Sequence, residues 1–90
     1  MKYNSKLKVL VIGCGNMGIS HAKAYQKIDK FEICGFVDTN PQALEKIASY
    51  ISADIPQFTN FTKALKATQP HVVCICTYPE THAKYSIQAI

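Results

Sequence analysis

The feature that most constrains this chain is a glycine-rich turn between a strand-like segment and a helix-like segment. Residues 8–12 are apolar after Lys8 and rich in β-branched side chains, and a helical pattern of apolar residues follows the turn. The turn itself is a G-x-G-x-x-G motif formed by Gly13, Cys14, Gly15, Asn16, Met17 and Gly18. Strand, glycine turn and helix in this order predict a βα unit whose loop lies at the carboxyl end of the strand.

The motif has the context of a phosphate-binding turn. Its first glycine permits a tight turn, its second lets the backbone approach a pyrophosphate, and its third allows close packing of helix and strand. Asp38 lies 20 residues after Gly18, at the end of a second strand-like segment, and its carboxylate can accept hydrogen bonds from an adenosine ribose. We therefore predict a dinucleotide site at the motif and Asp38. The alternative is a glycine turn beside a surface aspartate.

Asp38 also bears on the choice between NAD and NADP. A carboxylate at this position repels a 2′-phosphate, and NADP sites usually provide an arginine nearby. The chain contains no arginine, and the next two residues, Thr39 and Asn40, are neutral. We therefore expect NAD rather than NADP as the cofactor, with Thr39 beside Asp38 among the residues that bind it.

The remaining sequence repeats the alternation of strand and helix. Residues 31–37 and 71–76 are predicted strands, residues 55–58 a short strand, and residues 80–90 a helix. Pro41 opens a helix, and Asn60 caps another. The apolar sides of the helices are predicted to be Met17, Gly18, His21, Ala22, Ala24, Tyr25 and Ile28 in the first, Leu44, Ile47, Ala48 and Ile51 in the second, and Phe61, Ala64 and Leu65 in the third.

Four βα units in succession predict an α/β fold. We expect a Rossmann-type doubly wound parallel sheet with strand order 3-2-1-4, forming one incomplete dinucleotide-binding domain over residues 1–90. Of the histidines, His21 is predicted to pack within its helix and His71 to lie at a strand edge.

Composition argues against several other classes of protein. The formal net charge is +4 and every cation is a lysine, so the bidentate arginine contacts of nucleic-acid readers are absent. The apolar runs are far shorter than the ~18 residues of a membrane span, which excludes a membrane partner. The four cysteines follow no metal-site spacing, and we interpret them as small buried apolar residues of a reducing cytoplasm.

In these features the chain resembles the N-terminal domain of the glucose–fructose oxidoreductase/inositol dehydrogenase (Gfo/Idh/MocA) family. The matching segments are residues 11–18, 21–22, 37–41, 71–76 and 77–83. The resemblance implies an NAD(P)-dependent oxidoreductase that transfers hydride between a nicotinamide cofactor and a sugar, cyclitol or related hydroxyl substrate. It also implies that Thr77, Pro79 and His82 lie along the nicotinamide half of the cofactor.

The chain departs from that family at its end. Members continue into a fifth strand that ends in Glu-Lys-Pro and add a second, largely β-sheet domain. No catalytic residue can be assigned without them, so we expect the 90 residues alone to be inactive. We also expect self-association, or binding of the missing C-terminal half, through residues 71–76. Two alternatives are a stand-alone, non-catalytic NAD-binding or regulatory module and a Rossmann-like S-adenosylmethionine methyltransferase.

Overall fold

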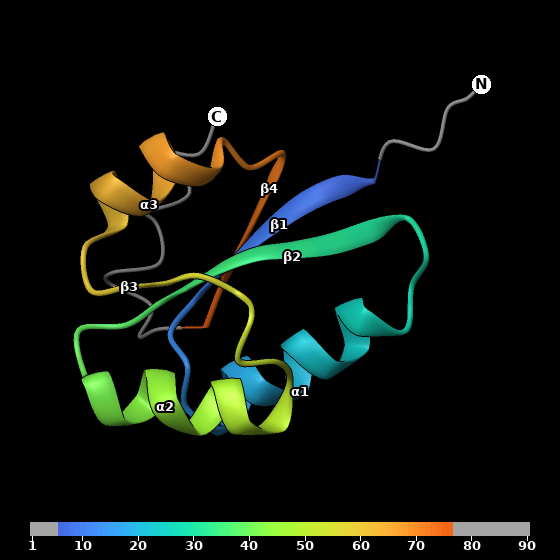
Figure 1. Ribbon diagram of the computed structural model, residues 1–90. Helices are drawn as coiled ribbons and strands as arrows, with labels where there is room; N and C mark the ends of the chain where they lie inside the picture. The colour runs from blue at the N-terminus through green and yellow to red at the C-terminus, as the bar shows by residue number, and fades with distance from the viewer. Residues whose placement is uncertain (1–5, 77–90) are drawn as a thin grey trace.

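Strands and helices alternate along the whole of the chain that the structure describes. The structure is a computed structural model and describes residues 6–76. Its elements in order (Figure 1) are β1 (Leu7–Ile12), α1 (Asn16–Gln26), β2 (Phe31–Val37), α2 (Pro41–Tyr50), β3 (Gln57–Phe58), α3 (Phe61–Thr68) and β4 (Val72–Ile75). The predicted helix over residues 80–90 lies outside the described residues.

The four strands form one parallel sheet in the order β3-β2-β1-β4, which confirms the predicted topology. β1 is central: Val9 pairs with Ile33 of β2 and with Val72 of β4. His71 lies at the entrance of β4, where its Nδ1 accepts the Lys8 backbone N–H at 2.9 Å. The carboxyl ends of β1 and β2 therefore lie together at one edge of the sheet, with the end of β4 beside them.

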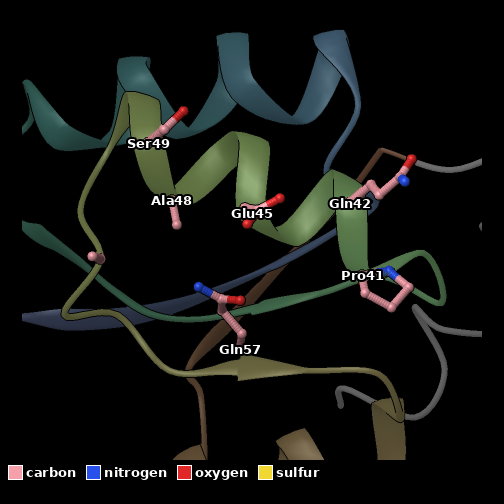
Figure 2. A pocket seen from close by; sticks show the side chains of 7 residues that line it. Pro41, Gln42, Glu45, Ala48, Ser49 and Gln57 are labelled. Carbon is pink, nitrogen blue, oxygen red and sulfur yellow. The ribbon is translucent and has the colours of Figure 1, made fainter.

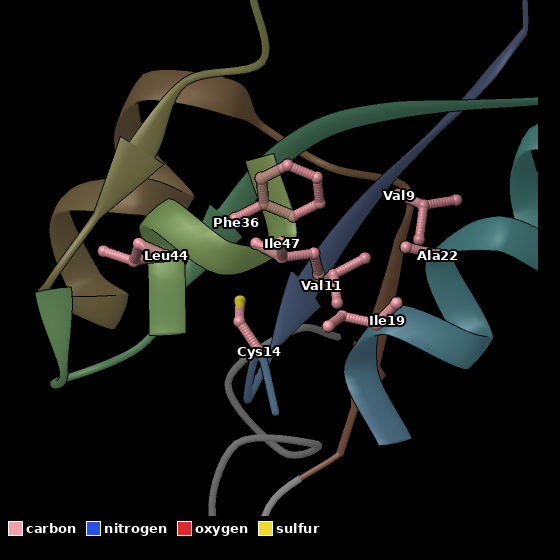
Figure 3. Packing of buried hydrophobic residues seen from close by; sticks show 8 residues of the cluster. All are labelled: Val9, Val11, Cys14, Ile19, Ala22, Phe36, Leu44 and Ile47. Atoms are coloured by element: carbon pink, nitrogen blue, oxygen red, sulfur yellow. The ribbon is translucent and has the colours of Figure 1, made fainter. Parts of the chain in front are cut away.

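Both faces of β1 are buried, as expected for the centre of a parallel sheet. The cluster on one face, which includes residues of α1 and α2 (Figure 3), is formed by Val9, Val11, Cys14, Ile19, Ala22, Phe36, Leu44 and Ile47. The cluster on the other face, which includes residues of α3, is formed by Leu10, Ile12, Val37, Phe61 and Ala64. Successive residues of β1 alternate between the two clusters because side chains of a strand point to opposite faces.

The residues at the starts of α2 and α3 have the roles that the sequence predicts. Pro41 is the first residue of α2, and the Asn40 side chain accepts the Gln42 N–H at 2.9 Å. The Asn60 side chain caps α3 by accepting the Lys63 N–H at 2.9 Å. α3 ends at Thr68, because the next residue, Gln69, has a left-handed φ of 47° and cannot continue the helix.

The predicted apolar face of α1 is partly wrong. The residues of this helix that are buried are Gly18, Ile19 and Ala22, with Tyr25 half-buried, whereas His21 and Ala24 are exposed. Met17 is 61% exposed and Ile28, which lies after the end of the helix, is 44% exposed. Gly18 packs closely against the backbone of the turn after β1. A helix can come this close to the turn only on its glycine side, and in this orientation Ile19 and Ala22 reach the core.

Candidate functional site

The turn after β1 begins with a backbone conformation that favours glycine. Gly13 has a φ of 88°, in the left-handed region that L side chains rarely adopt. Its N–H donates to the Val37 carbonyl at 2.8 Å, which continues the β1–β2 pairing for one more residue. Gly13 therefore turns the chain sharply while it is still attached to the sheet.

Gly18 is required for packing instead. A Cβ at this position would overlap the carbonyl oxygen of Gly13 and lie 3.0 Å from its carbonyl carbon. The first turn of α1 therefore touches the backbone of the turn that precedes it. This is the close helix–strand approach that the third glycine of the motif is predicted to allow.

Gly15 differs from both, because nothing in the described fold requires a glycine there. Its backbone is extended, with φ −78° and ψ −160°, and a Cβ would meet no atom within 4 Å. Gly15 is exposed and forms the N-cap of α1, which has no side-chain cap, whereas asparagine side chains cap α2 and α3. The free N–H groups of this first helical turn are suited to an anion supplied from outside.

The Asp38 carboxylate joins two turns at the carboxyl edge of the sheet. Its Oδ2 accepts the Cys14 N–H at 2.8 Å, and its Oδ1 accepts the Asn40 N–H at 2.9 Å. Asp38 is half-buried, so part of the residue is still reached by solvent. A carboxylate has about four acceptor positions, so acceptor capacity remains on both oxygens for the hydroxyls of a ribose.

Cys14 takes part in the site through its backbone. Its side chain is buried, with Sγ 3.5 Å from the Val37 carbonyl oxygen. Burial, together with the nearby Asp38 charge, raises the pKa of the Cys14 thiol to about 12, although a backbone hydrogen bond with Val37 acts in the opposite direction. The thiol is therefore uncharged near neutral pH, and a thiolate role at this position is excluded.

The other predicted site residues that the structure describes are exposed to solvent. Met17 and Thr39 are exposed, and so is Asn16. The Asn16 Oδ1 accepts from Lys46 Nζ of α2 at 3.3 Å. Sequence reasoning missed Lys46, because its place beside the turn depends on how α2 packs next to α1.

Three predicted contacts, Thr77, Pro79 and His82, lie outside the described residues. A hollow of about 560 Å³ is present elsewhere, between α2 and β3 (Figure 2). The residues that line it are Pro41, Gln42, Glu45, Ala48, Ser49, Ala53 and Gln57. Neither the glycine motif nor Asp38 contributes to this lining, so the hollow is separate from the predicted dinucleotide site.

Comparison with known proteins agrees with this geometry. A family model described as "oxidoreductase family, NAD-binding Rossmann fold" (Gfo/Idh/MocA) matches residues 7–90. The chain belongs to this family. The match confirms the predicted resemblance and decides against the methyltransferase alternative. A search of curated proteins gave no match.

Solved structures of several dehydrogenases share the fold of this domain. A scyllo-inositol dehydrogenase from Lactobacillus casei, crystallised with NAD(H) and scyllo-inositol, is 19% identical with a TM-score of 0.83, over 94% of this chain and 25% of its own. The WlbA dehydrogenase from Chromobacterium violaceum, in complex with NADH and UDP-GlcNAcA, is 25% identical with a TM-score of 0.82, over 92% of this chain and 24% of its own. This chain thus spans about a quarter of the length of either protein. Within residues 6–76, no helix is long and apolar enough to cross a membrane.

Proposed function

We propose that this Gfo/Idh/MocA domain binds NAD as the cofactor-binding part of an oxidoreductase acting on a hydroxyl group of a sugar, cyclitol or related compound. The observation that carries the proposal is the contrast among the three glycines of the turn. Gly13 and Gly18 are explained by backbone geometry and packing, whereas Gly15 has open space where its side chain would be. A pyrophosphate close to the backbone is what requires a glycine at this position.

Different residues of the site bind different parts of the dinucleotide. The uncapped N-terminus of α1 holds the pyrophosphate through its backbone N–H groups and the positive end of the helix dipole. Asp38 accepts hydrogen bonds from the adenosine ribose, and its bond to the Cys14 N–H keeps the turn in place for this contact. When bound, the nicotinamide accepts or supplies the hydride, while the protein fixes its position.

The same carboxylate supports NAD rather than NADP. A ribose 2′-phosphate would bring negative charge against Asp38, and the neighbouring Thr39 and Asn40 have no charge to offset it. Both Asp38 oxygens are already oriented by backbone N–H groups of two different turns, so the carboxylate cannot swing away without breaking hydrogen bonds.

Oxidation or reduction of the substrate also needs proton-transfer groups. We assign none of these groups to residues 6–76. The dehydrogenases with the same fold are about four times longer than this chain. We propose that a second polypeptide segment, joined or separate, supplies the proton-transfer groups and docks beside β4. In the described sheet β4 is a terminal strand, with β1 on its one paired side. A cytoplasmic location is part of the same proposal.

The proposal is tested at Gly15. Gly15→Val places a branched side chain in the open space above the turn, and we expect it to abolish NADH binding measured by calorimetry or fluorescence titration. The extended backbone of residue 15 accepts valine, so the fold is expected to persist. Ala67→Val, on the exposed side of α3, is the matched control and should leave NADH affinity unchanged. Equal NADH affinity in Gly15→Val and the unmodified chain would refute the phosphate-binding role of the turn.

A further inference from the structure

One charged side chain of α2 reaches across to the glycine turn. The Nζ of Lys46 donates to the Oδ1 of Asn16 at 3.3 Å. Asn16 is the first residue of α1 and directly follows Gly15, the N-cap. Both side chains are exposed to solvent. The Lys46 ammonium therefore lies beside the same helix end at which we propose that the pyrophosphate binds.

This ammonium has no negative partner among the described residues. Within residues 6–76, no carboxylate lies within ion-pair distance of the Lys46 Nζ. The first turn of α1 contains no acidic residue. The Asp38 carboxylate accepts the backbone N–H groups of Cys14 and Asn40 instead. The acceptor of the lysine is thus the uncharged amide of Asn16.

The position of the Lys46 charge is unfavourable with respect to the dipole of α1. A helix N-terminus carries partial positive charge, so a cation beside it is disfavoured and an anion is favoured. Lys23 shows the opposite arrangement, because it lies in the last turn of α1, with its Nζ 5.0 Å from the ring centroid of Tyr50 of α2. α1 and α2 lie side by side (Figure 1), and the two lysines bridge them near opposite ends of α1. Only Lys46 is at the end that disfavours its charge.

We propose that Lys46 is a further cofactor-binding residue, whose positive charge strengthens binding of the dinucleotide diphosphate at the N-terminus of α1. This inference rests on the proposed function, because it requires an anion at the turn. The diphosphate brings two negative charges close to the Asp38 carboxylate, and the chain has no arginine to offset them. Of the lysine ammonium groups in residues 6–76, only that of Lys46 contacts the motif. A cation that is unfavourable beside the helix end alone becomes favourable beside the bound anion.

A lysine on the neighbouring helix suits this role because its reach is adjustable. The ammonium is a compact charge on a flexible stem of four carbons. Its contact with Asn16 is a single hydrogen bond between exposed groups, so little free energy is lost when the bond breaks. The ammonium can stay on Asn16 beside the anion or turn toward it, and its charge contributes in both positions.

The contribution to affinity should be moderate and should depend on salt. At about 0.01 M ionic strength, where charges act over about 30 Å, we expect Lys46→Gln to weaken NADH binding by about 3–10-fold. At about 1 M, where the screening length is about 3 Å, the variant and the unmodified chain should bind NADH almost equally. The affinity of Lys46→Gln should therefore fall less steeply with salt than that of the unmodified chain.

Calorimetric titration of the full chain with NADH at both ionic strengths tests the proposal. Lys46→Arg keeps the charge and should bind NADH within about twofold of the unmodified chain, whereas Lys46→Glu should lose more affinity than Lys46→Gln. Lys66→Gln is the matched control, because it removes the same charge from the exposed side of α3, which packs on the opposite face of the sheet. Its NADH affinity should change by less than about twofold. An equal loss in Lys66→Gln and Lys46→Gln, or a loss that persists at about 1 M, would overturn the proposal.

Titration with NADPH separates the diphosphate from the 2′-phosphate as the group that the lysine serves. Both cofactors contain the diphosphate, so Lys46→Gln should weaken NADH and NADPH by the same factor. A loss confined to NADPH would show that the charge serves the 2′-phosphate, and this result would overturn the proposal.

Thermal unfolding without cofactor separates binding from a purely structural role. We expect Lys46→Gln to unfold at a temperature no lower than that of the unmodified chain, because a repulsion with the dipole of α1 is removed. A lysine that only ties α2 to α1 would behave differently. A lower melting temperature together with unchanged NADH affinity would show this structural role and overturn the proposal.

The Gly15→Val variant distinguishes failure of this inference from failure of the proposed function. NADH binding that Gly15→Val abolishes and Lys46→Gln leaves unchanged at about 0.01 M ionic strength would refute only the role of Lys46. If the unmodified chain bound no NADH, both the proposed function and the role of Lys46 would be refuted.

Discussion

Replacing Gly18 by alanine should destabilise the domain, although alanine is the better helix former. By helix propensity alone, glycine to alanine inside a helix stabilises by about 1 kcal/mol. Here the new Cβ would overlap the Gly13 carbonyl oxygen, which is backbone and cannot rotate away. Relief requires α1 to move outward, and α1 carries Ile19 and Ala22, which are 7% and 0% exposed in the core.

The magnitude follows from these two losses. Overpacking typically costs about 1–3 kcal/mol. Partial exposure of Ile19 adds a share of the roughly 1.5–3 kcal/mol that full burial of such a side chain contributes. We expect a net destabilisation of about 3 kcal/mol. A chain of this length has a total stability of roughly 4–13 kcal/mol, and each kcal/mol shifts its melting temperature by about 4–8 °C. The melting temperature should therefore fall by roughly 12–24 °C.

Urea and thermal unfolding followed by circular dichroism measure this effect. Gly15→Ala is the matched control, because a Cβ there meets nothing within 4 Å and its stability should stay within about 1 kcal/mol of the unmodified chain. If Gly18→Ala unfolds at the same urea concentration as the unmodified chain, α1 does not rest on the turn. Gly18 would then not determine the rotation of α1 either.

Three further predictions concern the site, the thiols and the sheet edge. Asp38→Ala should weaken NADH binding by about 1.5–3 kcal/mol, roughly 10–150-fold, and should narrow the preference for NADH over NADPH. Calorimetry with both cofactors measures this, and an unchanged ratio of the two affinities would show that Asp38 contacts no ribose. Alkylation of Cys74 should accelerate as pH rises through about 7, because hydrogen bonds from the Cys76 thiol and the Tyr25 hydroxyl lower the pKa of Cys74 to that value. Cys14 should stay unreactive below about pH 12, because its pKa is raised. Equal pH profiles of alkylation for the two cysteines would contradict this. The 90-residue chain should self-associate at micromolar concentration through β4 and should not oxidise inositol; a monomer in sedimentation, or robust turnover, would disprove these expectations.

Much of the fold follows from local signals in the sequence. The strand–helix alternation, the Asn60 cap and the apolar side of α2 need information from only a few neighbouring residues, and all three are confirmed. The strand order 3-2-1-4 follows from right-handed crossovers once four βα units are recognised. Of the predicted 55–58 strand, only Gln57 and Phe58 pair with β2 in the structure, opposite Phe36 and Val37.

The features that sequence reasoning missed depend on contacts between elements. The rotation of α1 follows from the close packing of Gly18 on the Gly13 carbonyl. The predicted apolar side of this helix included too many residues to define that rotation. The bond from Lys46 to Asn16 requires the placement of α2 beside α1. For Cys74 and Cys76 the spacing alone places both side chains on one face, but the approach of the Tyr25 hydroxyl comes from a different element.

The central place of β1 has a consequence for the order in which the domain folds. β1 pairs with β2 across one short helix, but its partner on the other side is β4, with Val9 and Val72 separated by 63 residues. Closing a longer loop costs more chain entropy, so the β1–α1–β2 unit should form first and β4 should dock last. That early unit already contains the glycine turn, Asp38 and the hydrogen bond between them. A nascent chain would therefore assemble its glycine turn before the sheet is complete. If the turn binds a dinucleotide as we propose, the cofactor would find this half of its site formed before β4 has docked.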